Sequence, residues 1–267
     1  TRSQLREQIN LPNVWKYLIE DPIGEVICER FKDDLIRGVV LTDALIGTFA
    51  SAYDLQANIC FLYHLIGNGT GEWKVPRGGM GALVGELIRV ATESGVEIRT
   101  KQKVVAIESA SDCVRVKTSS GEQFTAAHFL SNAAPGVLAE IRGKKKPESL
   151  DGAQLKINIL LKRLPQLKSG IDPQLAFAGT FHANESFTQC ESSYSEAKNG
   201  SMPAKLPIEM YCHTLTDPSI LSPELSASGF HTLTLFALHT PASLFDANNE
   251  TARQAALESA LASLNEY

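Results

Sequence analysis

The chain has 267 residues, of which 43% are hydrophobic and 21% charged, and its formal net charge is −5. These values are ordinary for a folded globular protein of one large or two small domains, and the acidic balance argues against nucleic acid as a partner. The five cysteines are scattered, odd in number, and without CxxC or metal-ligand spacing. They indicate reduced thiols in a cytoplasm-like compartment and no metal site.

The amino-terminal part of the chain is predicted to be mainly helical. Apolar residues recur at nearly helical spacing over 23–40, and Asp21-Pro22 before them suits an N-cap followed by proline in the first turn. The run 59–66 is apolar nearly all round, which is typical of a buried helix. His64 lies in this run, and two roles are open for it: a hydrogen-bonded core histidine or a residue of a substrate cavity.

A glycine-rich turn, Gly78-Gly79-Met80-Gly81, opens the next predicted helix. Gly95 is well placed to end that helix in the left-handed conformation. Short strands are then predicted at Val96–Arg99, Val104–Glu108, Val114–Thr118, Phe124–Ala126 and His128–Leu130, with a hairpin turn at Ser119-Ser120-Gly121.

The carboxy-terminal part is predicted to form a second sheet and a last helix. Strands are expected within 154–164, 207–213 and 230–238, and a helix over 249–264. Residues 184–203 are rich in Ser, Asn and Gly, which predicts a loop or a mobile insertion.

Lys156 is the most informative single residue, because it lies between Leu155 and Ile157 in an apolar strand. Lysine is rarely buried unless it is paired or functional. The alternative is a lysine on the exposed face of an alternating strand, with Asn158 on the same polar face. Both interpretations are open from the sequence.

Three stretches together resemble the phytoene desaturase-like flavoproteins. They are GGMGALVGELIRVATESGVEIRTKQKVVAI, SSGEQFTAAHFLSNAAP, and LKINILLKRLP followed later by PIEMYCHTLTDPSILSPELSASGFHTLTLF. The likeness is greatest to the branch of pyridine nucleotide-disulfide oxidoreductase domain-containing protein 2, which TDALIG and WKVPRGGMG also fit. It covers nearly all of this chain but only the middle of the family's length, since a strand with G-x-G-x-x-G is missing.

The resemblance implies that FAD binds the full-length protein. By analogy, the backbone of Val104 contacts the adenine, and small residues at Asn132 and Ala133 let the backbone approach the phosphates and sugar. Gly78 and Gly79 are likewise implied to be cofactor-binding. Related amine and polyamine oxidases carry a lysine in the matching strand that holds a water beside the flavin, so the resemblance implies a catalytic or orienting role for Lys156.

The expected fold is α+β, with a mixed-sheet substrate-binding lobe and a partial FAD-binding lobe that lacks the first βαβ unit. Residues 1–75 and 141–267 are assigned to the substrate-binding lobe, and 76–140 to the FAD-binding lobe. Met80 and His64 are expected to contact the substrate.

The resemblance implies hydride transfer from an apolar polyene-like or amine substrate to the flavin. The alternative is a non-catalytic module that binds a lipid-like ligand or a protein. The location is expected to be cytoplasmic, or mitochondrial in a eukaryote, with no transmembrane segment and with peripheral membrane contact left open. Because the pyrophosphate of FAD needs the helix of the missing βαβ unit, this chain alone is expected to be colourless.

Overall fold

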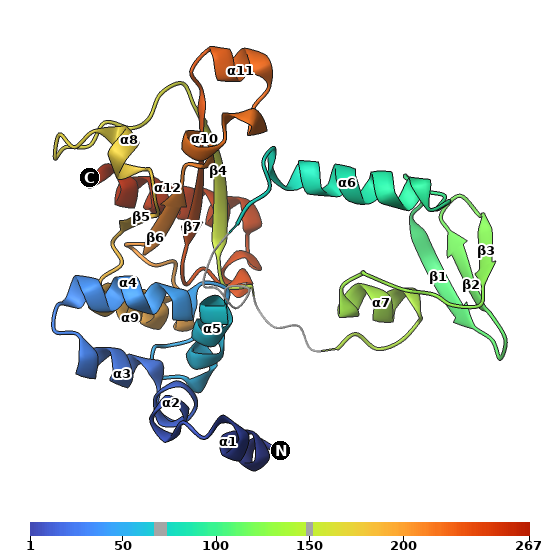
Figure 1. The fold of residues 1–267 in the computed structure, drawn as a ribbon, viewed down its shortest axis with the longest axis horizontal. Coiled ribbons are helices and arrows are strands. Elements are labelled where there is room, and N and C mark those ends of the chain that lie inside the picture. The colour runs from blue at the N-terminus through green and yellow to red at the C-terminus, as the bar shows by residue number, and fades with distance from the viewer. Residues whose placement is uncertain (67–73, 148–151) are drawn as a thin grey trace. The chain divides into compact units, whose positions relative to one another are not determined.

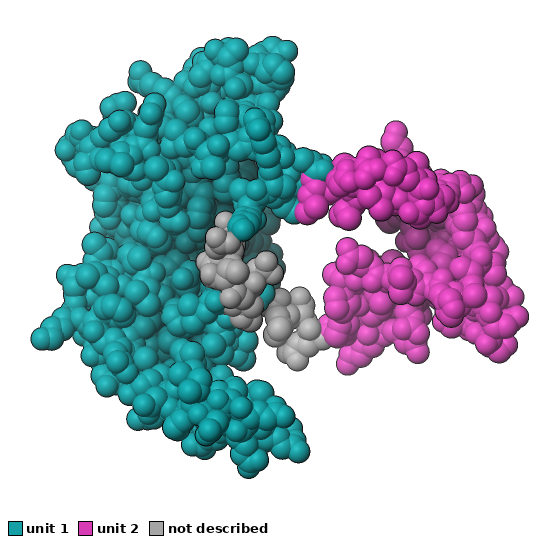
Figure 2. All heavy atoms as spheres, in the orientation of Figure 1, with its two compact units in different colours: residues 1–82, 151–267 teal, residues 83–150 magenta. Residues whose placement is uncertain are grey.

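The computed structural model describes residues 1–66, 74–147 and 152–267 (Figure 1). The chain forms two compact units, residues 1–82 with 151–267 and residues 83–150 (Figure 2). The described residues contain helices and two antiparallel sheets, which confirms the α+β class. Every strand pair in these sheets is antiparallel, so the expected mixed sheet is wrong. The assignment of substrate-binding and FAD-binding lobes stays a prediction.

The first unit begins with a helical layer. Its elements are α1 (Arg2–Ile9), α2 (Pro12–Trp15), η1 (Lys16–Glu20), α3 (Ile23–Arg30), α4 (Asp34–Leu45) and α5 (Leu55–Ile66). The apolar pattern of 23–40 belongs to two helices, because Asp33 caps a new one: its Oδ1 accepts the N–H groups of Leu35 and Ile36, each at 3.0 Å. Pro22, not Asp21, occupies the N-cap position of α3.

The second part of this unit is a four-stranded sheet in the order β4-β7-β6-β5. Its strands are β4 (Leu155–Leu161), β5 (Phe181–Ala183), β6 (Ile208–Tyr211) and β7 (His231–Ala237). Alternate residues form one apolar face, with Leu235 and Met210 buried at its centre. Ala260 and Leu264 of the long helix α12 (Asn249–Asn265) pack against this face.

The connection between β5 and β6 contains α9 (Phe187–Lys198), where a loop was expected. Ser186 caps the helix by accepting the N–H of Gln189 at 3.2 Å. The helix buries Phe187, Cys190 and Ala197 along one side, and it lies beside α4 (Figure 1). The loop prediction failed because the small residues that signal flexibility in isolation also allow close helix packing.

The remaining short helices of this unit lie in the connections that follow the strands. They are α8 (Pro173–Ala176), α10 (His213–Thr216), η3 (Pro218–Ile220), α11 (Pro223–Ala227) and η4 (Ala242–Phe245). None of the helices in the described ranges is both long and apolar enough to cross a lipid bilayer.

The second unit contains most of α6 (Gly79–Glu93), the sheet β1-β2-β3 and α7 (Pro135–Ile141). The strands are β1 (Val104–Ser109), β2 (Val114–Thr118) and β3 (Gln123–Ala126). Gly95 has φ 82° after α6, and Gly121 has φ 90° in the β2–β3 turn, which confirms both predicted turns. Residues 96–99 and 128–130, predicted as strands, are not strands, because the described part of the chain gives neither segment a pairing partner.

Candidate functional site

One face of the four-stranded sheet carries a row of polar and aromatic side chains. Lys156 of β4 lies opposite Phe236 of β7, Phe236 lies opposite Glu209 of β6, and Glu209 lies opposite His182 of β5. Residues opposite one another on neighbouring strands project from the same face. The four side chains therefore form one row that crosses the whole sheet, on the face away from α12.

A second row lies beside the first. Asn158 is opposite Thr234, whose Oγ1 donates to Asn158 Oδ1 at 3.5 Å, and Thr234 is opposite Tyr211. The Tyr211 ring meets Phe236 edge to face, with 6.1 Å between centroids, and lies parallel to His213 at 6.0 Å. Aromatic rings thus occupy the centre of this face, which suits contact with a flat or unsaturated molecule.

Lys156 is exposed on the edge strand β4, and its neighbours Leu155 and Ile157 face the other way. Its Nζ lies 5.2 Å from the centroid of the Phe236 ring, a cation–π contact that restrains the ammonium group. Asn158 is exposed on the same face, as expected for an alternating strand. The Lys156 side chain is therefore not buried, and the role of Lys156 in catalysis stays a prediction.

Glu185 is a buried carboxyl next to the row. It follows β5, is fully buried, and its Oε2 makes a short hydrogen bond with His182 Nδ1. Burial raises the pKa of Glu185, and His182 only partly offsets that effect. Burial lowers the pKa of His182, but the hydrogen bond and the charge of Glu185 outweigh it, so the net shift is upward.

Glu209 is a second buried carboxyl, with 3% of its surface exposed. Burial raises its pKa to about 7, and the nearby charge of Glu185 adds to the shift. The pKa of Tyr211 is also raised, by burial and then by Glu209. A carboxyl group that titrates near neutral pH can both accept and release a proton under ordinary conditions.

The turn at Gly78 and Gly79 has φ values of 83° and 74°, which side-chain-bearing residues rarely adopt. The N–H of Gly78 donates to Asp217 Oδ2 at 2.6 Å, and a β-carbon on Gly79 would lie 3.4 Å from the Ile220 side chain. The turn is therefore fixed to the segment that follows α10. Met80, in the first turn of α6, is 63% exposed.

The other predicted cofactor residues lie in the second unit. Val104 begins β1, an edge strand of its sheet, and the pairing with β2 is irregular between Val104 and Ala106. Asn132 and Ala133 are exposed ahead of α7, and the Ala133 N–H donates to Ser131 Oγ at 3.2 Å. The predicted site residues are thus divided between the two units.

His64 is half-buried on α5. Its Nδ1 lies 2.9 Å from the carbonyl oxygen of Cys60, one turn earlier, and its ring meets Tyr63 edge to face at 5.3 Å. Both roles left open for His64 are compatible with this position.

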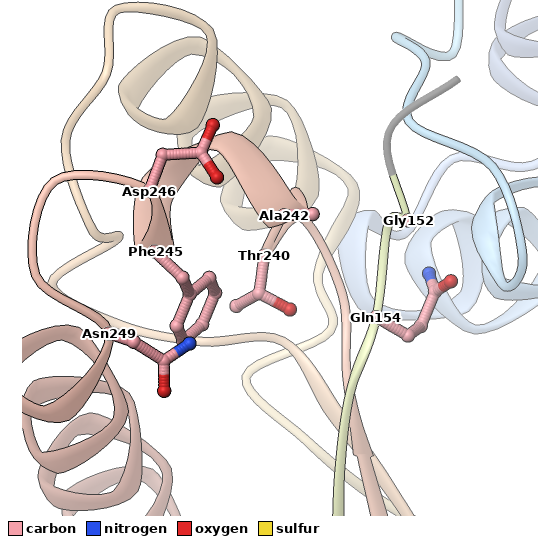
Figure 3. A pocket seen from close by; sticks show the side chains of 7 residues that line it. All are labelled: Gly152, Gln154, Thr240, Ala242, Phe245, Asp246 and Asn249. Carbon is pink, nitrogen blue, oxygen red and sulfur yellow. The ribbon is translucent and has the colours of Figure 1, made fainter. Parts of the chain in front are cut away.

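Two pockets border the four-stranded sheet. One, of about 360 Å³, lies between the end of β7 and the start of α12, where Thr240, Phe245 and Asn249 line it (Figure 3). The other, of about 520 Å³, lies at the β5 edge and is lined by residues that include Phe181 and His182. The first contains none of the predicted site residues.

Sequence reasoning missed His182, Glu185, Glu209 and Tyr211. Glu209 carries the same signal as Lys156, a charged residue within an apolar strand, and could have been found by it. No element was predicted at His182, and Glu185 lies in the stretch 184–203 where a loop was expected. Their partnership depends on the course of the chain after β5, which the sequence does not reveal.

Comparison with known proteins identifies the family. A family model described as flavin containing amine oxidoreductase matches residues 3–263. Uncharacterized proteins of Mycobacterium tuberculosis and Mycobacterium bovis are each 43% identical over 278 residues, covering 99% of this chain and 52% of theirs. Pyridine nucleotide-disulfide oxidoreductase domain-containing protein 2 of Mus musculus is 30% identical over 256 residues, and the match covers 88% of this chain and 43% of the length of the mouse protein.

The chain spans about half the length of the curated relatives that it matches. The family model, however, matches this chain over almost its whole length, including both units and the polar sheet face. The chain therefore belongs to the flavin containing amine oxidoreductase family.

Proposed function

We propose that this chain is the substrate-binding region, with part of the FAD-binding domain, of an oxidoreductase that resembles phytoene dehydrogenases. The observation that carries the proposal is the row on the sheet face, in which the exposed Lys156 lies over Phe236 beside the Tyr211 ring. A face of this kind can hold an unsaturated or apolar substrate against aromatic rings while presenting one cation at its edge.

The residues proposed to hold FAD fit that role. Since an edge strand pairs on one side only, β1 leaves backbone groups on its other side for recognition of an adenine edge, and the irregular pairing at Val104 adds to this. Asn132 and Ala133 are exposed and small enough for close approach. Gly78 and Gly79 form a turn that tolerates no β-carbon without strain. FAD, when bound, would supply the hydride acceptor.

Lys156 would orient water or O₂ for the redox step, and it is not required as a base. Its ammonium group has three donors, and the Phe236 ring uses none of them as a conventional hydrogen bond. The donors therefore stay available to a ligand on this face. Met80 and His64 are proposed to contact the substrate.

The proposed substrate is apolar, either a polyene or an amine in its neutral form. Exposed apolar side chains near His64 support this choice: Ile59 and Tyr63 of α5 are each 70% exposed. Exposed apolar side chains that lie together are typical of a binding surface.

A second candidate function is a non-catalytic module that binds a lipid-like ligand or a protein. The exposed position of Lys156 on an alternating edge strand favours it, because a lysine in that position needs no function. The two candidates differ in one respect that can be measured, which is whether the full-length protein holds a flavin.

The test begins with the absorption spectrum of the purified full-length protein, which should contain FAD at one per chain. The flavin is then photoreduced without substrate and mixed with O₂ in a stopped-flow instrument. Lys156→Met should slow reoxidation at least about tenfold with FAD content unchanged. Lys162→Met, an exposed lysine just after β4, is the matched control and should reoxidise normally.

Each part of the result has a clear meaning. A full-length protein without flavin would refute the oxidoreductase proposal and favour the binding module. A flavoprotein in which Lys156→Met reoxidises as fast as the control would refute the role of Lys156 and leave the oxidoreductase proposal standing.

A further inference from the structure

The sheet row changes from exposed to buried and back along its length. Lys156 is exposed at the β4 edge, Glu209 is 3% exposed near the middle, and the His182 side chain is 24% exposed at the β5 edge. A buried carboxyl in the interior of a sheet face, with a partly exposed histidine beside it, is costly to maintain unless its charge is balanced.

The buried groups carry more negative charge than their partners can balance. Glu185 pairs with His182, while Glu209 has no ion-pair partner among the described residues. One oxygen of each carboxyl, Oε1, is also without a hydrogen-bond partner in the part of the chain that the structure describes. Two ionised carboxylates and one imidazolium would leave a net buried negative charge, so this cluster favours holding a further proton.

The surroundings of the cluster strengthen this conclusion. Asp43 of α4 is close enough for its charge to act on Glu209, Glu185 and Tyr211, and it adds negative charge. Tyr211 lies two residues after Glu209 on β6 and is uncharged at neutral pH. The groups that face the carboxyls therefore supply no cation other than His182 in the described residues.

His182 connects the cluster to the surface. Its Nδ1 is held by Glu185, and its ring also lines the pocket of about 520 Å³ at the β5 edge. An imidazole fixed at one nitrogen can take a proton at one side and release it at the other. The cluster is thus in contact with the sheet face through Glu209 and with a pocket through His182.

The proposed reaction needs a group that accepts a proton. Oxidation of a CH–CH or CH–NH unit to C=C or C=N sends a hydride, with both electrons, to the flavin and breaks a second C–H or N–H bond. The electron pair of that second bond forms the new double bond, and its proton must leave the apolar site. The sheet face holds a buried carboxyl, Glu209, that is able to accept this proton.

We propose that Glu209 and His182, the latter positioned by Glu185, form a proton relay that takes up the proton released by substrate oxidation and passes it to the pocket at the β5 edge. The role of the relay in substrate oxidation rests on the proposed function. The ability of the cluster to hold a proton does not, because it depends only on residues of this chain. Glu185 acts as a positioning residue, because it fixes the ring of His182 and has no exposed surface.

The first experiment measures the proton directly. Infrared difference spectra of the full-length protein between pH 6 and pH 8 should show a protonated carboxyl group that ionises in this range, where an ordinary glutamate is already ionised. The signal should be lost in Glu209→Gln, which keeps the shape of the side chain. It should persist in Glu250→Gln, whose side chain is 88% exposed. An unchanged signal in Glu209→Gln would overturn the proposal.

The second experiment tests the relay without knowledge of the substrate. Reoxidation of the photoreduced flavin by O₂ to give hydrogen peroxide consumes one proton, so a working relay makes its rate depend on pH. We expect an inflection near neutral pH in the wild type, and a rate at least about tenfold lower without that inflection in Glu209→Gln and His182→Gln. Lys156→Met should slow the reaction and keep the inflection.

The two experiments separate failure of the relay from failure of the proposed function. If the full-length protein holds no flavin, the proposed function is refuted, and the infrared titration still decides whether the cluster holds a proton. If flavin is present and both variants keep the wild-type pH profile, the relay is refuted while the oxidoreductase proposal survives.

Discussion

Replacement of Gly38 by alanine tests how closely α4 packs on the chain after β5. A β-carbon at this position would lie 1.7 Å from the carbonyl oxygen of Glu185 and 2.6 Å from the backbone nitrogen of Phe187. Since ordinary contacts begin near 3.4 Å, the helix would have to withdraw by about 1.7 Å. A gap of that size would loosen the fully buried Leu41 and Leu45 on the same helix.

The expected loss follows from these contacts. Each leucine contributes about 1.5–3 kcal/mol by burial, and a gap of only about 0.5–1 Å already removes a quarter to a half of the dispersion energy. The larger gap expected here should therefore cost the two leucines together at least about 1–3 kcal/mol. Overpacking strain adds about 1–3 kcal/mol, and the better helix propensity of alanine returns about 1 kcal/mol. We therefore expect Gly38→Ala to lower the free energy of unfolding by about 1–5 kcal/mol.

Urea unfolding followed by circular dichroism measures this change, and hydrogen exchange in α4 shows where it acts. Gly85→Ala is the control, because Gly85 lies in the interior of α6 and nothing lies within 4 Å of its added β-carbon. The control should keep its stability or gain about 1 kcal/mol. If Gly38→Ala behaved like the control, the direct packing of α4 on this backbone would be refuted.

Two further substitutions test the sheet and the helical layer. Leu235→Ala should lower the free energy of unfolding in urea by about 2–5 kcal/mol, because the side chain is fully buried against α12. Leu160→Ala, on the exposed face, should lower it by less than about 0.5 kcal/mol. Equal losses would contradict a core on one face of the sheet. Burial lowers the pKa of His239 from 6.5 to about 4, so folding favours its neutral form. Stability should therefore be lost as the pH falls from 6.5 towards 4, by up to about 3 kcal/mol, and the urea midpoint of His239→Asn should fall less over this range.

The sheet that carries the candidate site was largely predictable from sequence. Alternation of apolar and polar residues marked β4 and β7, and it placed Lys156 and Asn158 on one face, as the structure has them. Register within one strand depends on local pattern, and a hydrophobic face fixes it strongly. The sequence therefore identified which side chains share a face.

The partners across the sheet were not predictable. Glu209 lies opposite His182 because of the order of the strands in the sheet. Glu185 contacts His182 because the chain turns back directly after β5. α9 was missed for a related reason: its buried side includes small residues such as Cys190 and Ala197, whose packing value appears only once α4 lies beside them. The partners of Glu209 and the formation of α9 both depend on tertiary contacts, which local sequence patterns do not show.

The position of β4 within its sheet has a consequence for folding during synthesis. Among the strands of the described residues, β4 is hydrogen-bonded only to β7, whose residues follow it by about 70 positions in the chain. At a synthesis rate of about 5–20 residues per second, β4 leaves the ribosome several seconds before its partner exists. During this interval the apolar residues of β4 have no partner strand, which is the condition under which a strand pairs with another chain. We therefore expect nascent chains that end before His231 to depend on chaperones, and this dependence to cease once β7 has emerged.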